Sequence, residues 1–288
     1  MSNVKVMTDS VAGIPQNLAK EYQIKVIPAA NIHYNGTTYV DGVTLNAAEA
    51  YKLIKKDPDR FTTSALNPGY FLEEFKKLNQ KDLQLIHLSL SSALSATFKT
   101  ASMGADMYIE EFPGSRISVV DTLACASTQG LVVLAVAKAA AQGKGLDNLI
   151  EYSKYVRQQT RGIMMLDTLR YVYRTGRMSK LGSRIASLFN IKPINELTDA
   201  GKIELWDRVR DREKGYQKIV DYVKEKASSK SLHFMVMHAD APEMANTMVS
   251  LLKQEFDCLS VIISEYSPIM GYGAGPGCIF VGFHPELK

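Results

Sequence analysis

Two groups of hydroxyl side chains are the best candidates in this sequence for binding an anion. Thr62, Thr63 and Ser64 form the first group, and Ser91 and Ser92 follow an apolar run typical of a buried strand. Because open α/β sheets bind ligands beyond the carboxyl ends of their strands, we expect Ser91 and Ser92 to lie at the N-terminus of the next helix. Free backbone N–H groups there favour a carboxylate or a phosphate, although either serine could instead be a simple N-cap.

A serine hydrolase that acts on acyl esters is the alternative function for the second group, with Ser92 as the nucleophile. The sequence has 5 histidines that could serve as the base. However, a nucleophile elbow has the pattern G-x-S-x-G, and no glycine stands two residues before or after Ser92. His87 lies inside the expected strand, and no histidine has a recognisable spacing from Ser92. The hydrolase hypothesis therefore rests on Ser92 alone.

Residues 270–277 are rich in glycine. They lack the Gly-Lys-Ser/Thr ending of a P-loop, and a strand rather than a helix is expected to follow them, which excludes a dinucleotide fingerprint. We expect either a tight turn or a backbone segment that passes close to a ligand.

Positive charge is concentrated in the second half of the chain. This cluster is either a solvated face or a surface that meets a phosphate or a protein partner, since arginine suits bidentate phosphate contacts. Its members are Arg170, Arg174, Arg177, Lys180, Arg184 and Lys192, with Arg208, Arg210 and Arg212 downstream.

The composition argues against several classes of protein. The net charge is only +4 and no basic stripe with interleaved aromatic residues occurs, so we expect no nucleic-acid partner. The 3 cysteines form no CxxC pair, and no cluster has metal-ligand spacing, so we expect no metal or cofactor. The most apolar long stretch, residues 131–141, is too short to span a bilayer. The N-terminal residues lack the apolar core of a signal peptide, and we therefore expect a cytoplasmic protein without stable membrane insertion.

With 288 residues, the chain is long enough for two domains. In residues 1–155 strands alternate with helices, which predicts an α/β/α domain with a parallel sheet. This domain carries both clusters of hydroxyl side chains. In residues 156–288 hairpins combine with two helices, which predicts an α+β domain with a mixed or antiparallel sheet. The expected fold class is therefore a two-domain α/β protein.

Hydrophobic periodicity and turn residues predict the individual elements. Strands are expected at residues 4–7, 24–32, 83–90, 117–120, 162–166, 191–196, 202–209, 232–237, 259–264 and 279–283. Helices are expected at residues 46–55, 68–78, 128–142, 212–226 and 242–255, and another from about residue 97 to 107. Hairpin turns are expected at Asn35-Gly36 and Asp199-Ala200-Gly201.

A set of short motifs, in the same order along nearly the whole chain, resembles the DegV family of bacterial fatty-acid-binding proteins. Each motif alone is unspecific, whereas the ordered set is specific. The motifs are Thr8-Asp9-Ser10, Ile27-Pro28, Tyr39-Val40-Asp41-Gly42, Thr63-Ser64, Leu90-Ser91-Ser92-Ala93-Leu94-Ser95-Ala96-Thr97, Asp121-Thr122, Gly176-Arg177, Ile191-Lys192-Pro193-Ile194 and Gly275-Pro276-Gly277.

The resemblance implies two α/β domains with a long-chain fatty acid buried between them, its carboxylate held by Thr63 and Ser92. Further residues that it implies near the head group are Thr62, Ser91, Ser95, Ser10 and Gly273. It also implies that the protein is not itself an enzyme: an ATP-binding fatty acid kinase subunit, its partner, would phosphorylate the bound carboxylate to an acyl phosphate. The missing P-loop agrees with this role. Gly273 stands where the family often has a histidine, and Ala96 where it has a glycine.

Overall fold

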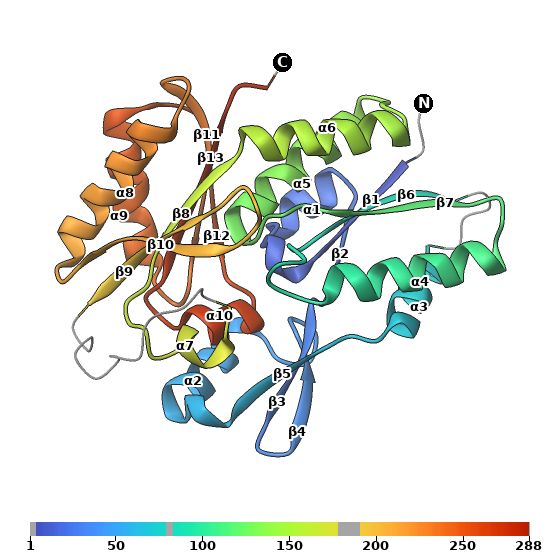
Figure 1. The fold of residues 1–288 in the computed structure, drawn as a ribbon, viewed down its shortest axis with the longest axis horizontal. Coiled ribbons are helices and arrows are strands. Elements are labelled where there is room, and N and C mark those ends of the chain that lie inside the picture. The colour runs from blue at the N-terminus through green and yellow to red at the C-terminus, as the bar shows by residue number, and fades with distance from the viewer. Residues whose placement is uncertain (1–3, 79–82, 178–190, 288) are drawn as a thin grey trace.

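The computed structural model of the chain describes residues 4–78, 83–177 and 191–287 (Figure 1). Within these ranges, the first half of the chain forms a four-stranded parallel sheet with the strand order β2-β1-β6-β7. Because all four strands are parallel, their carboxyl ends meet at one edge of the sheet. The strands are β1 (Val4–Asp9), β2 (Ile24–Ile27), β6 (Gln84–Ser89) and β7 (Arg116–Asp121).

Helices cover both faces of the parallel sheet, which confirms the expected α/β/α arrangement. On one face, Phe71 and Tyr108 belong to the apolar cluster that joins two helices to the sheet. On the other face, Val133 and Leu149 do the same. The first pair of helices is α3 (Pro68–Lys76) and α4 (Thr97–Glu111), the second pair is α5 (Ala126–Ala141) and α6 (Leu146–Gln159), and α1 (Gln16–Glu21) connects β1 to β2.

The expectation of one strand over residues 24–32 is wrong. The chain leaves the parallel sheet after Ile27, because Pro28 has no N–H group to continue the ladder. The next strand, β3 (Ala30–Tyr34), is the centre of an antiparallel sheet with the order β4-β3-β5. Its neighbours are β4 (Thr37–Val40) and β5 (Phe61–Ala65), the second of which the sequence pattern does not predict. The hairpin turn at Asn35-Gly36 is confirmed, with φ angles of 49° and 78°.

The connection from β4 to β5 contains α2 (Ala47–Lys56), as expected for residues 46–55, and a short 3-10 helix over Pro58–Arg60. The Asn46 side chain accepts a hydrogen bond from the Glu49 backbone N at 2.9 Å, which explains where α2 begins.

The second half of the chain forms a mixed sheet with the order β10-β9-β8-β13-β11-β12, as expected. Among these described strands, β11 and β12 pair in parallel and the other neighbours pair antiparallel. The strands are β8 (Arg161–Met165), β9 (Lys192–Leu197), β10 (Ile203–Val209), β11 (Ser231–His238), β12 (Asp257–Glu265) and β13 (Ile279–Pro285). α8 (Arg212–Lys226) and α9 (Pro242–Glu255) cover one of its faces.

α5 lies between the two large sheets and packs against β1 on one side and against β11 and β13 on the other (Figure 1). Most of its residues are buried. A Cβ atom on Gly130 would lie 2.6 Å from the carbonyl oxygen of Ala12 and 2.5 Å from the sulfur of Met235, so only glycine permits this close approach. The expected division of the chain at residue 155 falls inside α6 and stays a prediction.

His87 on β6 is fully buried, and neither of its ring nitrogens has a hydrogen-bond partner in the described part of the chain. Its ring meets the ring of Phe71 edge to face, with the centroids 6.0 Å apart. Burial lowers the pKa of His87 from 6.5 to about 3. Below pH 6.5 the unfolded chain therefore takes up a proton that the folded chain rejects, so stability is lost as the pH falls.

We predict that His87→Leu removes this acid sensitivity, with a difference on the order of 3 kcal/mol in the free energy of unfolding near pH 4. Urea unfolding at a series of pH values measures it. Phe71→Leu, a change to the partner ring, serves as the control, because it should lower stability by the same amount at every pH. An equal pH slope for the wild type and His87→Leu would contradict the prediction.

Candidate functional site

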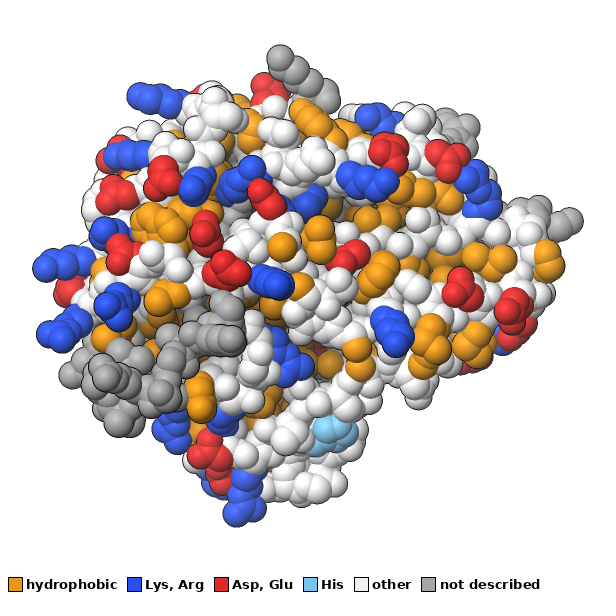
Figure 2. All heavy atoms as spheres, in the orientation of Figure 1, with side chains coloured by type: hydrophobic (Ala, Val, Ile, Leu, Met, Phe, Trp, Pro, Cys, Tyr) orange, Lys and Arg blue, Asp and Glu red, His pale blue; other side chains and the backbone are white. Residues whose placement is uncertain are grey.

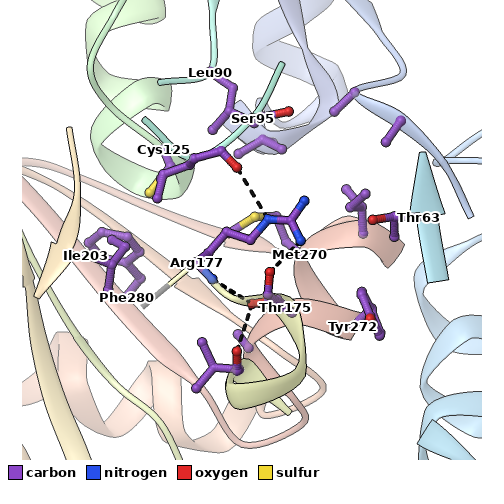
Figure 3. Close-up of a pocket in the computed structure, with 18 of the residues that line it drawn as sticks. Thr63, Leu90, Ser95, Cys125, Thr175, Arg177, Ile203, Met270, Tyr272 and Phe280 are labelled. Atoms are coloured by element: carbon purple, nitrogen blue, oxygen red, sulfur yellow. Dashed lines mark hydrogen bonds between the residues drawn. The ribbon is translucent and has the colours of Figure 1, made fainter. Parts of the chain in front are cut away.

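A cavity lies where the two large sheets and the β3–β5 sheet meet (Figure 3). The space inside it is about 140 Å³, or about 840 Å³ when the open solvent at its mouth is counted. Part of its wall comes from the loops after β1, β2 and β6 of the parallel sheet, and part from strands of the mixed sheet and of the three-stranded sheet. The rest comes from α7 (Val172–Thr175) and α10 (Pro268–Ala274). Most of this wall is apolar, and it includes Val11, Leu90, Met164, Leu166, Ile203 and Phe280.

The polar side chains Thr63 and Ser95 and the guanidinium group of Arg177 lie away from the apolar side chains Ile203 and Phe280 in the cavity wall. Figure 3 shows Ile203 and Phe280 at the left, Thr63 at the right, Ser95 at the top and the guanidinium group of Arg177 in the middle. A cavity with one polar end and a long apolar wall fits an amphipathic ligand with a single head group.

Thr63 reaches the cavity because side chains alternate along β5. Its neighbours Thr62 and Ser64 point to the opposite face of the three-stranded sheet, where Ser64 Oγ lies 2.9 Å from Nε2 of His33. The three hydroxyl side chains of Thr62, Thr63 and Ser64 are thus divided between the two faces of this sheet. Thr63 lines the cavity, and Thr62 is exposed outside it.

The expectation that Ser91 and Ser92 begin a helix is wrong. The Ser91 carbonyl oxygen accepts hydrogen bonds from the backbone N of Leu94 at 3.0 Å and of Ser95 at 3.1 Å, which closes a separate turn. α4 therefore begins only at Thr97, whose backbone N donates to Ser95 Oγ at 3.3 Å. The turn carries Ser95 into the cavity wall.

Ser91 and Ser92 lie elsewhere. Ser91 is fully buried, and its Oγ donates to the carbonyl oxygen of Gly201 at 2.8 Å. Ser92 is exposed, its backbone N donates to Asp121 Oδ1 at 3.1 Å, and it is not one of the described residues that line the cavity. Of the three serines in this segment, Ser95 is thus the one that lines the cavity together with Thr63.

Arg177 lies at the polar end of the cavity, directly after Gly176, whose φ of 64° ends α7. Its Nη1 donates to the carbonyl oxygen of Thr175 at 2.6 Å, and its Nε donates to that of Leu94 at 3.4 Å. The guanidinium group therefore bridges the end of α7 and the turn that carries Ser95, and it contributes a positive charge to the cavity wall.

The other arginines predicted for this patch have separate surroundings. Nη1 of Arg174 donates to the carbonyl oxygen of Pro58 and, at 2.9 Å, to Asp59 Oδ1. Arg170 and Arg210 are exposed. On the face in view, Figure 2 shows basic and acidic side chains interspersed rather than gathered by sign. Two further members of the sequence cluster, Lys180 and Arg184, lie outside the described residues.

The glycine-rich stretch is not a single tight turn. Residues 268–274 form α10, and a turn follows in which Gly275 and Gly277 have φ angles of 82° and 83°. Gly273 lines the cavity, and a Cβ atom there would have its nearest neighbour, Cγ2 of Thr175, at 4.0 Å. The wall therefore has room for a larger side chain at this position.

The buried carboxylate of Asp41 fixes α10 and the loop before β3. Asp41 Oδ1 accepts a hydrogen bond from the backbone N of Ile269 at 2.9 Å, and Oδ2 accepts one from Ser10 Oγ. Ser10 Oγ in turn accepts one from the backbone N of Ala29 at 3.0 Å. Burial raises the pKa of Asp41. Ser10, which the resemblance places near the head group, thus acts here as a link between Asp41 and the cavity wall.

A second buried carboxylate, Asp9, lies at the end of β1. It accepts hydrogen bonds from the backbone N of Leu90 at 2.8 Å and of Val11 at 3.2 Å, and from Nε2 of Gln129 at 3.1 Å. Burial raises its pKa to about 6. Since Leu90 and Val11 both line the cavity, Asp9 positions its wall from the side of the parallel sheet. Asp9 and Asp41 belong to the motifs that resemble the DegV family, but the sequence assigns neither of them a role in the cavity wall.

The described residues contain no group of three or more His, Cys, Asp and Glu side chains that could hold a metal ion. In the same part of the chain, no histidine forms a hydrogen bond with the Ser92 hydroxyl group, so nothing in the geometry supports the hydrolase alternative. No helix within the described ranges is long and apolar enough to cross a membrane.

Comparison with known proteins shows the family of the chain. A family model described as "Uncharacterised protein, DegV family" matches residues 3–286. The chain belongs to the DegV family. A DegV domain-containing protein of Caldanaerobacter subterraneus subsp. tengcongensis is 32% identical to it over 287 residues, which cover 99% of this chain and 100% of that protein.

Solved DegV structures have the same fold. A DegV family protein from Thermus thermophilus, whose structure describes fatty acid binding, superposes with a TM-score of 0.88 at 23% identity, covering 98% of this chain and 99% of that one. DegV from Bacillus subtilis, described as a fatty acid binding protein, has a TM-score of 0.85 at 25% identity, covering 99% of this chain and 100% of that one.

We predict that Asp41→Ala lowers the free energy of unfolding by about 2 kcal/mol, because the buried N–H of Ile269 and the hydroxyl of Ser10 lose their acceptor. Denaturant unfolding measures the change. Asp57→Ala is the matched control: Asp57 forms a partly exposed ion pair with Arg60 at 2.9 Å, and such pairs contribute little. Equal effects of the two variants would contradict the role of Asp41.

Proposed function

We propose that this DegV protein binds a long-chain fatty acid in the cavity, with the carboxylate at Thr63, Ser95 and Arg177 and the acyl chain directed toward Ile203 and Phe280. The observation that carries the proposal is the placement of the polar lining groups at one end of an otherwise apolar wall. The two sheets between which the ligand lies correspond to the two proposed domains, with the division near residue 155.

The energetics of transfer favour such a ligand. Each buried methylene group contributes about 0.8 kcal/mol, so an acyl chain of about sixteen carbons gains on the order of 12 kcal/mol before the costs of association are subtracted. A buried carboxylate costs several kcal/mol unless it is hydrogen-bonded. The hydroxyl groups of Thr63 and Ser95 can donate to it, and the charge of Arg177 balances its own.

The relatives support the proposal through what their structures describe. The Bacillus subtilis and Thermus thermophilus proteins with this fold are described as binding fatty acids. In this chain we assign the second hydroxyl donor to Ser95 rather than to Ser92, because Ser95 lines the cavity and Ser92 is exposed.

We further propose that the bound fatty acid is the substrate of a separate kinase subunit, which brings the ATP and phosphorylates the carboxylate. The chain itself has no P-loop. The proposed carboxylate site includes Arg177, which is exposed and could bind a phosphoryl group or an acidic side chain of the partner. We propose the cytoplasm as the compartment, since Cys125, Cys258 and Cys278 are unpaired thiols.

We predict that the purified wild type carries a fatty acid, and that Thr63→Val and Ser95→Ala each lower the affinity about tenfold because a donor to the buried carboxylate is lost. Native mass spectrometry with lipid extraction detects the bound acid, and displacement of a fluorescent fatty acid measures the affinity.

Ser92→Ala is the matched control, since it removes an exposed hydroxyl from the neighbouring turn, and it should bind like the wild type. A protein that carries no lipid and takes up no added fatty acid would refute the proposed function. A loss of affinity in Ser92→Ala but not in Ser95→Ala would refute the assignment of the donor.

We predict that the charge reversals Arg170→Glu and Arg210→Glu slow the formation of acyl phosphate at least tenfold when a cognate kinase subunit and ATP are added, while fatty-acid affinity stays unchanged. Both side chains are exposed and neither belongs to the described cavity wall. The control is Arg116→Glu, because Arg116 is exposed at the start of β7, away from the carboxyl ends of the strands. Equal rates for all three variants and the wild type would contradict the proposal that Arg170 and Arg210 contact the kinase subunit.

A further inference from the structure

A second cavity lies where the C-terminal half of α6 meets the loop after β7 and the turn between β9 and β10 (Figure 1). The space inside it is about 480 Å³, or about 980 Å³ when the open solvent at its mouth is counted. That is room for far more than one water molecule. None of the described residues that line it also lines the cavity proposed for the fatty acid, so the two cavities are separate.

Arg157 of α6 is a buried cation in the wall of this second cavity, with only 9% of its side chain exposed. Its Nε donates to the carbonyl oxygen of Leu123 at 2.9 Å, its Nη1 to that of Thr160 at 3.2 Å and its Nη2 to that of Thr198 at 2.7 Å. These bonds hold the guanidinium group in one place and leave some of its N–H groups unused.

The charge of Arg157 has only a distant counter-ion among the described residues. Asp199 Oδ1 lies 3.9 Å from Nη1 of Arg157 and 3.6 Å from Nη1 of Arg161, both beyond hydrogen-bond length, and the Asp199 side chain is 80% exposed. Burial lowers the pKa of Arg157, while Asp199 opposes this shift and Arg161 adds to it. Since buried charges in proteins are normally paired, the two arginines lack an anion of their own.

The other charged groups of the wall leave a place for such an anion. Nη1 of Arg161 donates to two backbone carbonyl oxygens, and its Nε and Nη2 have no hydrogen-bond partner in the part of the chain that the structure describes. Lys154 is exposed and pairs at 2.7 Å with Glu151, which lies outside the described wall. Asp121 also lines the cavity, but its Oδ1 accepts hydrogen bonds from two backbone N–H groups, which offset part of its charge.

We propose that this second cavity binds a phosphate group, free or as the monoester of a small polar molecule, between Arg157 and Arg161, with Lys154 adding a third positive charge. Arginine suits phosphate because its N–H groups can contact two oxygens at once. A doubly charged phosphate supplies the counter-charge that the exposed Asp199 provides poorly, and it displaces Asp199 from the two arginines. The proposal is independent of fatty-acid binding, which concerns the other cavity.

The test is isothermal titration calorimetry of the whole chain with inorganic phosphate, ribose 5-phosphate and uncharged ribose, at one ionic strength set with chloride. We expect Arg161→Gln to lower the affinity for the phosphate-bearing probes about tenfold, because a charge-assisted contact is lost. Lys154→Gln, an exposed change that spares the fold, should lower it about threefold. Asp199→Asn should instead raise it about threefold, because the competing carboxylate is removed.

Arg116→Gln is the matched control: it removes the same charge from an exposed arginine outside the described wall, one that pairs with Asp147 at 2.7 Å. It should bind like the wild type. Tighter binding of ribose 5-phosphate than of phosphate would support an ester as the ligand, and the reverse order the free ion. A wild type without saturable phosphate binding, unchanged affinity in Arg161→Gln, or an equal loss in Arg116→Gln would each overturn the proposal.

Discussion

The burial of α5 between two sheets is the constraint on which the rest of this structure depends. A helix that is apolar on all sides is stable only when it is covered on all sides, and here β1, β11 and β13 provide the cover. Gly130 makes the double contact possible by admitting the carbonyl of Ala12 and the sulfur of Met235 at once. Because α5 fixes the two sheets relative to each other, the cavity forms beside its first residues, where Cys125 lines the wall and burial raises the pKa of its thiol to about 12.

The polar end of the cavity depends on a different kind of interaction. Asp9 and Asp41 are buried at a cost that shows in their raised pKa values, and each offsets part of that cost by accepting hydrogen bonds from loops that line the cavity. Strand ends and a short helix from distant parts of the sequence are thereby joined through two carboxylates. The carboxylates of Asp9 and Asp41 already accept hydrogen bonds from the protein. The hydroxyl groups of Thr63 and Ser95 and the cation of Arg177 therefore remain to bind a ligand head group.

Much of the fold follows from local sequence patterns. The apolar period of residues 212–226 predicts α8 with the bounds that it has in the structure, and the turn residues at Asn35-Gly36 predict the hairpin. The assignment of the fold class is confirmed for this reason, whereas the role of Thr63, which lines the cavity, stays a prediction. What fails depends on contacts between distant residues. α10 is hidden by its glycines and depends on a carboxylate 228 residues away in sequence, and the start of α4 depends on hydrogen bonds to the carbonyl of Ser91.

The choice among the serines depends on such contacts as well. Ser92 and Ser95 have the same chemistry and similar neighbours in sequence, and only the turn geometry decides which of them faces the cavity.

The cavity has two kinds of wall. One belongs to the large sheets that α5 holds in place, and the other consists of β3, β5 and α10, small elements that lie outside both large sheets. Small elements open at a lower free energy than a sheet core does. The wall formed by β3, β5 and α10 is therefore expected to open at a lower free energy than the wall formed by the large sheets, so access to the cavity would not require the framework around α5 to unfold.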